Sequence, residues 1–200
     1  MNMLIVSPVH TDAARAALRI AGEYYSPALL NHAVRSYHWA AALARADDIT
    51  IDDELLFVAA MLHDFGLLPE FDSYALDFEE AGGHVAVVFA AGAGWAPARA
   101  RRVREIIVRH MGEPVDVDTD PEGHLLHRAT GIDITGRETG LTPAVIRAEV
   151  LSQWPRLGLA EEFTHCFEQQ AVRKPRSAAA VALRHGLATK LRENPLGKPE

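Results

Sequence analysis

The chain has 200 residues, of which 48% are hydrophobic and 24% are charged, and its formal net charge at pH 7 is −7. These values are typical of a globular protein, so they exclude a disordered chain, a collagen-like repeat and a disulfide scaffold. An acidic chain without a basic run is also a poor candidate for binding a nucleic acid duplex. A chain of this length usually forms one domain, so we expect a single domain over residues 1–200.

Apolar residues recur at three- and four-residue spacing through most of the chain, whereas alternating runs of Val, Ile and Thr are missing. We therefore expect an all-α fold, a compact bundle of about eight or nine helices. Capping residues, acidic first turns and first-turn prolines mark the helix starts, and glycines mark several of the ends. In chain order, the expected helices span about residues 12–24, 27–45, 52–66, 78–91, 97–111, 121–130, 142–154, 160–172 and 177–191, followed by a frayed tail over 194–200.

The adjacent pair His63 and Asp64 lies at the end of an apolar helix, in the sequence AAMLHDFG. Burying a carboxylate is unfavourable unless a partner compensates its charge, and a divalent cation is one such partner. Imidazole nitrogen and carboxylate oxygen together suit Zn, Fe, Mn, Co or Ni. Two ligands cannot hold such an ion. His32 in an earlier apolar helix, and Asp133 after a glycine that we expect to end a later one, would complete the set if the helices pack antiparallel.

The order His … His-Asp … Asp resembles the HD superfamily of metal-dependent enzymes, which are all-α proteins. The resemblance is carried by LNHAVR around His32, MLHDFG around His63 and Asp64, and TGIDITG around Asp133. It implies that these four residues hold a divalent transition metal, zinc or iron. It also implies a catalytic domain that uses the metal to activate water.

Four further segments make the chain similar to the cyanamide-hydratase-like branch of that superfamily. They are NHAVR at 31–35, FEEAG at 78–82, IIVRH at 106–110 and WPRLG at 154–158. The similarity extends over about residues 24–175, which we take as the core of the domain. It implies a hydratase or hydrolase that adds metal-activated water to a small electrophile such as cyanamide or a related nitrile.

Two further histidines, His84 and His110, leave the number of metal ions open. Some HD enzymes, among them phosphodiesterases and a small group of diiron oxygenases, hold a second ion with two additional histidines at about these places. The resemblance therefore allows two ions with six ligands, or one ion with His110 lining the pocket. In either case we expect Asp64, His84, His110 and Asp133 to act in catalysis by aligning water, polarising the substrate or moving protons.

The sequence departs from several HD families directly after the His-Asp pair, where LLPE occupies residues 67–70 in place of a basic residue. This departure argues against a phosphate substrate, although Arg35, Arg109 or Arg137 would each supply a positive charge. The open alternatives to a hydratase are a diiron oxygenase acting on a small polar substrate and a nucleotide or phosphate-ester phosphohydrolase. A non-catalytic binding module is a further alternative of another class.

The expected partner is a small-molecule substrate, and we expect no nucleic acid duplex and no membrane. The N-terminal segment lacks the basic region of a signal peptide, and no apolar stretch reaches the ~18 residues of a membrane span. Cys166 is the only cysteine in the sequence, which fits a cytoplasmic location.

The last expected helix has an apolar face that either packs into the core or forms a contact between the two chains of a homodimer. This face consists of Leu183, Leu187 and Leu191. Six histidines show no partner pattern, and we interpret them as surface or structural: His10, His38, His124, His127, His165 and His185.

Overall fold

The computed structural model describes residues 10–197, which form ten α-helices and three short 3₁₀ helices, with no strand among these residues. The all-α fold expected from the sequence is therefore confirmed. The α-helices are α1 (Asp12–Tyr24), α2 (Pro27–Ala46), α3 (Asp53–Leu62), α4 (Phe78–Gly92), α5 (Pro97–Arg109), α6 (Pro121–Thr135), α7 (Ala144–Gln153), α8 (Leu159–Arg173), α9 (Ala178–Arg184) and α10 (Leu187–Glu193). The 3₁₀ helices are η1 (Phe65–Leu67), η2 (Thr139–Leu141) and η3 (Pro195–Gly197).

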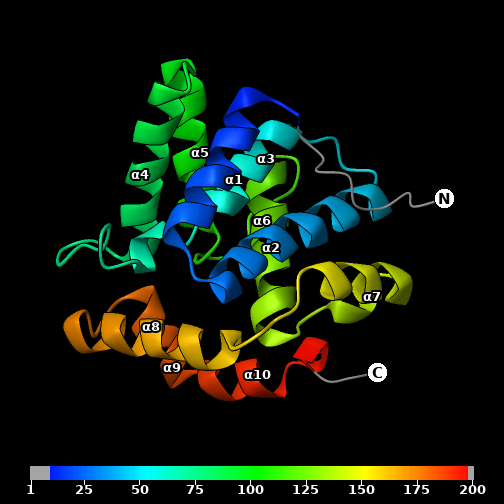
Figure 1. Cartoon of the computed structure of the whole chain (residues 1–200), viewed down its shortest axis with the longest axis vertical. Coiled ribbons are helices and arrows are strands. Elements are labelled where there is room, and N and C mark those ends of the chain that lie inside the picture. Colours follow the sequence, from blue (N-terminus) through cyan, green and yellow to red (C-terminus); the bar gives the residue numbers. More distant parts are fainter. Residues whose placement is uncertain (1–9, 198–200) are drawn as a thin grey trace.

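The helices surround a central pair, α2 and α3, with His32 on α2 and with His63 and Asp64 directly after α3. Figure 1 shows α4 and α5 side by side on one flank, and α8, α9 and α10 together below α2. Helix α2 packs against α3, α6 and α8, and α3 packs against α1 and α5. The ends of α2 and α3 that carry the ligands therefore lie inside the bundle.

Helix α3 is buried because apolar residues occupy nearly all of its faces, whereas α2 is buried together with polar residues such as His32 and Arg35, which have partners inside the bundle. Every residue of α2 from Asn31 to Ala44 is buried, and so is every residue of α3 from Leu55 to Leu62. A helix that is apolar on all sides is stable only in the interior. Side-chain caps fix where each begins: Ser26 accepts from the Leu29 amide, and Asp52 accepts from the Leu55 amide. The burial of α3 carries the residues that follow it into the core.

A close approach between backbones holds α4 against the segment after α3. A Cβ atom at Gly66 would lie 1.9 Å from the carbonyl oxygen of Phe78, where α4 begins. A Cβ atom at Gly82 would lie 3.1 Å from the carbonyl oxygen of His63. The missing side chains allow this contact, which fixes the turn that carries the His-Asp pair.

The expected end of a helix at Thr130 was wrong. Helix α6 continues through Gly131 and ends at Gly136, which adopts the left-handed conformation with φ of 73°. Asp133 therefore lies in the last turn of α6, not after it. Asp133 is six residues after His127 and two after Gly131, so its side chain points to a different side of α6 from these two residues.

The C-terminal part of the chain also differs from expectation. The single helix expected over 177–191 is broken at Gly186, with φ of 80°, into α9 and α10. The described part of the tail is not frayed, because Asn194 and Leu196 are buried and η3 follows α10. Residues 198–200 and the N-terminal segment 1–9 lie outside the described residues.

The apolar face of the last helices belongs to the core. Leu187 and Leu191 are buried within the chain, and Leu183 packs against the same core. Homodimer formation stays a prediction.

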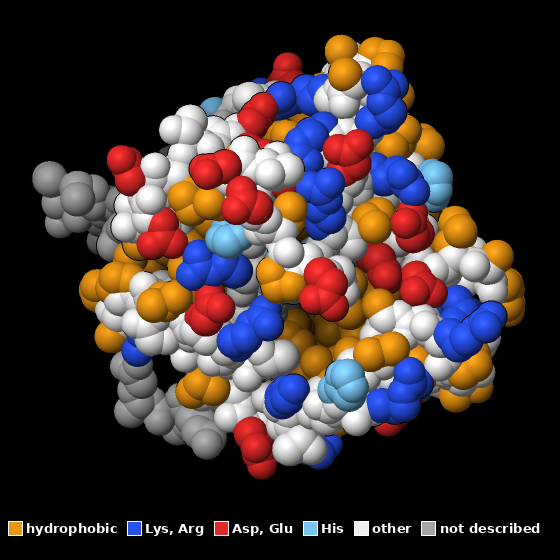
Figure 2. All heavy atoms as spheres, turned by 180° about the vertical axis from the view of Figure 1, so that it is seen from behind, with side chains coloured by type: hydrophobic (Ala, Val, Ile, Leu, Met, Phe, Trp, Pro, Cys, Tyr) orange, Lys and Arg blue, Asp and Glu red, His pale blue; other side chains and the backbone are white. Residues whose placement is uncertain are grey.

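Among residues 10–197, no helix combines the length and the apolar character needed to cross a membrane. Seen from the side opposite to Figure 1, the surface has a hollow with a hydrophobic floor and charged side chains of both signs around it (Figure 2).

Candidate metal centre

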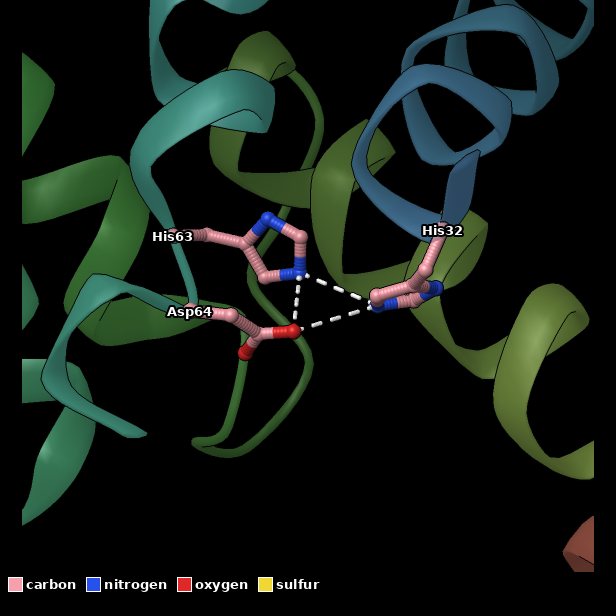
Figure 3. Close-up of side chains that lie close together, drawn as sticks. All are labelled: His32, His63 and Asp64. Carbon is pink, nitrogen blue, oxygen red and sulfur yellow. Dashed lines mark hydrogen bonds and ion pairs between the residues drawn. The ribbon is translucent and has the colours of Figure 1, made fainter. Parts of the chain in front are cut away.

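Three predicted ligands converge where the first half of α2 meets the end of α3 (Figure 3). Oδ2 of Asp64 lies 3.3 Å from Nε2 of His32 and 3.2 Å from Nε2 of His63. The two Nε2 atoms lie 3.2 Å from each other. All three side chains are almost completely buried. Two nitrogens and one oxygen therefore point at one place that bulk water does not reach.

The second nitrogen of each imidazole is already engaged, which determines what Nε2 offers. Nδ1 of His63 donates to the carbonyl oxygen of Ala60 at 2.7 Å. Nδ1 of His32 donates to Oδ2 of Asp133 at 2.7 Å. Neutral histidines held in this way present the unprotonated Nε2, which is the form that binds a metal. Two such lone pairs beside a carboxylate repel each other unless a cation lies between them.

The carboxylate of Asp64 is the strongest sign that a cation belongs here. Its side chain is 1% exposed, and neither oxygen receives a hydrogen bond from the described residues. Burial raises the pKa of Asp64, but the neighbouring His63 and His32 outweigh burial and hold that pKa below its ordinary value. A buried carboxylate without donors is unfavourable by several kcal/mol unless a positive charge compensates it. The residues present thus fit a divalent metal ion.

Without a metal, a proton is the available cation. Burial lowers the pKa of His32, but its hydrogen bond to Asp133 and the nearby Asp64 outweigh burial and raise the pKa overall. A metal ion would therefore compete with a proton for Nε2 of His32, and binding would release that proton.

Asp133 lies beside this cluster and does not complete it. Arg35 forms a two-pronged pair with its carboxylate, from Nε to Oδ1 and from Nη2 to Oδ2, both at 2.8 Å. Trp39 donates its indole N–H to Oδ1 at 2.9 Å. Burial raises the pKa of Asp133, but the Arg35 charge outweighs it and keeps that pKa well below its ordinary range. Both oxygens of Asp133 are engaged in this way, so its role as a fourth ligand stays a prediction, and its hydrogen bond to Nδ1 of His32 is the contact that the structure shows.

The partner of Asp133 was not identified from the sequence, although a signal was present. His32, Arg35 and Trp39 stand at positions i, i+3 and i+7 of α2, which places them on one face of the helix. A carboxylate that meets this face contacts all three. Such a carboxylate–histidine–metal arrangement is a common way to fix the direction and the tautomer of a ligand.

His110 reaches the cluster from the end of α5. Its ring packs edge-on against His63 with 4.9 Å between ring centres, and its Nε2 lies 3.9 Å from Oδ1 of Asp64. Its Nδ1 makes a short contact with the carbonyl oxygen of Ile107. Burial and then the neighbouring His63 lower the pKa of His110 to about 3, so the ring is neutral. Its Nε2 is therefore an acceptor at the edge of the cluster.

His84 does not join this group. It is exposed on α4 and lines a separate apolar groove that also includes Tyr24 and Val88. The reason is local: Gly82 and Gly83 face η1 and α5, and the next residue along the helix points elsewhere. The six-residue set that two ions would need is therefore not assembled among the described residues.

A cavity of about 190 Å³ opens beside the cluster and is lined by His32, His63, Asp64 and His110. Its remaining wall is mainly apolar, with the aromatic rings of α8 prominent in it. The volume is below the ~300–1,000 Å³ of a typical drug-sized pocket, so the cavity suits a small ligand.

Helix α6 and the residue that follows its cap supply polar wall residues. His127, Thr130 and Arg137 line the cavity together with Gly131. His127 was interpreted from the sequence as surface or structural, and the structure places it on the cavity wall instead. Its position four residues before Gly131, hence one helical turn away on the same face, was the available signal.

Residues 29–155 match the protein family described as HD domain. The chain therefore belongs to the HD-domain family, whose members bind divalent metals, and the expectation drawn from the four motif residues is confirmed at this level. Two relatives from Saccharomyces cerevisiae are cyanamide hydratase DDI2 and cyanamide hydratase DDI3. Each is 27% identical over 176 residues, which covers 86% of this chain and 78% of the relative. The family and these relatives support a metal-dependent enzyme.

Proposed function

We propose that this chain is a metal-dependent hydratase or hydrolase that adds water to a small electrophilic carbon, with cyanamide or a related nitrile as the substrate class. The observation that carries the proposal is the buried carboxylate of Asp64, which lacks hydrogen-bond donors and faces the Nε2 atoms of His32 and His63 at the wall of a small cavity. The similarity to two cyanamide hydratases supports the same class of substrate.

A single ion, zinc or iron, suits this donor set. Two imidazoles and one carboxylate without a thiolate are ligands that either metal accepts. Three protein ligands leave positions for water and substrate. When bound, the ion supplies Lewis acidity and lowers the pKa of water toward neutrality. His32, His63 and Asp64 would hold it, and Asp133 would keep His32 in the right tautomer.

The chain's own groups can manage the proton that hydration requires. Adding water to a nitrile forms a bond between the water oxygen and the nitrile carbon and moves one proton to the nitrile nitrogen, so no oxidant or reductant is needed. Oδ1 of Asp64 faces the Nε2 acceptor of His110 at 3.9 Å. Either atom can accept the proton from water and return it to nitrogen. This addition gives an imidic acid, and transfer of its remaining O–H proton from oxygen to nitrogen gives the amide, which for cyanamide is urea.

The aromatic wall of the cavity supports the same reaction. Phe163 packs edge-on against His32 with 5.5 Å between ring centres, and Phe167 packs against Phe163 with its ring tilted by 31°. These rings exclude bulk water from one side of the cluster and limit the size of the substrate. In such an apolar setting, the charges at the centre act more strongly than they would in water.

The two alternatives receive less support from the geometry. A diiron oxygenase would need six ligands, and His84 lies outside the cavity. A phosphohydrolase would need positive charge at the substrate. Of the three arginines named above, Arg35 is paired with Asp133 and Arg109 with Asp120, which leaves Arg137 on the cavity wall, and no basic residue directly follows the His-Asp pair. Substrate-dependent oxygen uptake by the metal-loaded protein would favour the oxygenase over the hydratase. Phosphate release from a nucleotide would favour the phosphohydrolase.

The test is a paired measurement of metal content and urea formation from cyanamide. Protein purified without a nickel column should contain about one zinc or iron per chain and form urea. His63→Ala and Asp64→Asn should lose both the metal and the turnover, because each removes a ligand. His84→Ala is the matched control, since this histidine is exposed and outside the cavity. Full activity in either ligand variant would disprove the proposal.

A further inference from the structure

One arginine on the cavity wall has no acidic partner among the described residues. Arg137 follows α6 and its cap, and it lines the cavity that contains the metal cluster. The neighbouring arginines are used differently: Arg35 and Arg156 lie against Asp133, and Arg128 pairs with Glu138. A guanidinium that faces a cavity without a carboxylate partner is available to a ligand.

The guanidinium of Arg137 is held in place from two sides. Its Nη2 lies 3.3 Å from Nε2 of His127, whose Nδ1 lies 3.2 Å from the carbonyl oxygen of His110. The carbonyl can only accept, so Nδ1 of His127 donates to it and Nε2 accepts from Arg137. Burial, and then the Arg137 charge, lower the pKa of His127, which agrees with a neutral ring. This chain links Arg137 to the backbone at His110.

The second side is the backbone of α6 at Gly131. A Cβ atom there would lie 2.6 Å from Nη2 of Arg137 and 3.2 Å from its Cζ and Nε atoms. The guanidinium therefore occupies the space that any other residue at 131 would fill. Since an arginine has five N–H donors and the contact with His127 uses one, several donors remain for a ligand.

The cavity thus has two chemically different ends. His32, His63 and Asp64 are almost completely buried, whereas Arg137 is exposed, so the metal cluster forms the inner end and the guanidinium the outer end. The wall contributed by Phe163 is apolar. A ligand that spans the cavity would place its electrophilic carbon inside and an anionic group outside.

The volume agrees with a ligand of this length. The cavity of about 190 Å³ holds more than one small molecule of solvent size. Cyanamide has only three non-hydrogen atoms and would leave much of this space to water, so a longer nitrile fills the cavity better.

We propose that the substrate is a small nitrile that carries a carboxylate, and that Arg137 determines this specificity by binding the carboxylate at the outer end. A planar guanidinium binds a carboxylate through two parallel hydrogen bonds, which gives both affinity and orientation. The inference rests on the proposed function for the reacting group, but the role of Arg137 can be measured without turnover.

The test compares cyanoacetate with cyanoacetamide, which differ in charge and hardly in size. Binding of each to the metal-loaded full-length protein is measured by titration calorimetry, and hydration of each is followed by product formation. The unsubstituted protein should bind cyanoacetate at least about tenfold more tightly, as expected for a charge-assisted hydrogen-bonded pair. Arg137→Gln should reduce this preference to about threefold or less, by loss of the same pair. Arg101→Gln is the matched control, because Arg101 is exposed on α5 and outside the cavity.

A second variant tests whether the guanidinium of Arg137 must lie at this position or whether a positive charge nearby is enough. Gly131→Ala keeps the arginine but places a Cβ atom where Nη2 lies, so the guanidinium must move. Because alanine favours a helix more than glycine, the fold should be preserved. Gly131→Ala should therefore lose the cyanoacetate preference as Arg137→Gln does.

The outcomes separate this inference from the proposed function. Equal binding of the two nitriles by the unsubstituted protein, or an unchanged preference in both variants, would overturn the role of Arg137 even if cyanamide is hydrated. Conversely, if no nitrile is hydrated but the cyanoacetate preference is present and lost in both variants, the proposed reaction fails and the anion site stands.

Discussion

Nδ1 of His32 lies 2.7 Å from Oδ2 of Asp133, on the side of the imidazole that faces away from Asp64. The same carboxylate is neutralised by Arg35 and receives the indole N–H of Trp39. We therefore expect this residue, in the last position of the motif, to act through the histidine. His32 would contact the metal, whereas Asp133 and Arg35 would hold its imidazole in the required orientation.

The first prediction concerns Asp133→Asn. An amide keeps the shape but weakens the hold on His32, so the affinity for zinc should fall by about 10- to 100-fold, as is usual when an outer partner of a ligating histidine is changed. Competition with a chelator of known affinity measures this change. If Asp133 were itself a ligand, its loss would abolish metal binding as completely as His63→Ala does.

The second prediction concerns the buried ion pair itself. Arg35→Met leaves the carboxylate of Asp133 without its main compensating charge, so the free energy of unfolding should fall by about 3–5 kcal/mol. Denaturant unfolding of the metal-free protein measures it. Arg15→Met serves as the control, because its pair with Asp12 is exposed and such pairs contribute little. A negligible loss of stability in Arg35→Met would contradict the ion pair described for α2 and α6.

The third prediction is a pH dependence of stability at Glu79. This side chain is 7% exposed, and its Oε2 has no hydrogen-bond partner among the described residues. Burial raises the pKa of Glu79 from 4.5 to about 7. Between these values the unfolded chain ionises this group while the folded chain does not, so its contribution to stability falls as the pH rises and stays low above pH 7.

Glu79→Gln should therefore be more stable than the unsubstituted protein at pH 8, by about 1–3 kcal/mol, and nearly equal to it at pH 4. Urea unfolding at the two pH values measures the difference. Glu168→Gln, an exposed carboxyl on α8, should show no such dependence. A Glu79→Gln variant that is equally stable at pH 8 would show that the carboxyl is not buried as described.

The fourth prediction concerns the contact between α4 and the turn that carries the His-Asp pair. Gly66→Ala places a Cβ atom 1.9 Å from the Phe78 carbonyl oxygen, so the backbone must shift, and stability should fall by about 1–3 kcal/mol or more. Metal affinity should fall as well, because the turn holds Asp64. Gly92→Ala is the control, since no atom lies within 4 Å of a Cβ atom there. Thermal unfolding and metal titration of the two variants measure these effects. If Gly66→Ala were as stable as Gly92→Ala and bound the metal as tightly, the contact described here would be wrong.

The sequence predicted those parts of the fold that depend on local signals. Asp12, Pro27, Pro97 and Pro121 begin helices as expected, because capping and first-turn proline preferences act within a few residues. The convergence of His32, His63 and Asp64 followed from the motif and from helix burial. Gly131 and Gly186 show the limit, because the first continues a helix and the second breaks one. Packing against other helices determines whether a glycine continues or ends its helix. This packing cannot be predicted from the neighbouring residues in the sequence.

The functional roles that were missed depend on contacts between distant parts of the chain. Arg35 and Asp133 are separated by 98 residues, and although Arg35 shares one face of α2 with His32, no pattern in the sequence shows that Asp133 meets that face. In the same way, His84 faces outward because the two preceding residues, Gly82 and Gly83, form the contacts of α4 with η1 and α5. His127 and Arg137 lie on the cavity only because α6 continues to Thr135 and ends at Gly136.

The end of α6 is capped by side chains that follow it in the chain. Asn194 donates to the carbonyl oxygen of Asp133 at 2.8 Å, and Arg156 donates to the same oxygen. A carbonyl in the last turn of a helix has no partner within that helix, so these side chains supply what α6 lacks. During synthesis, a chain that has emerged only to the end of α6 already contains every proposed ligand but neither of these caps. Stable metal acquisition is therefore expected only after α7 to α10 have emerged and the segments that carry Arg156 and Asn194 dock behind Asp133.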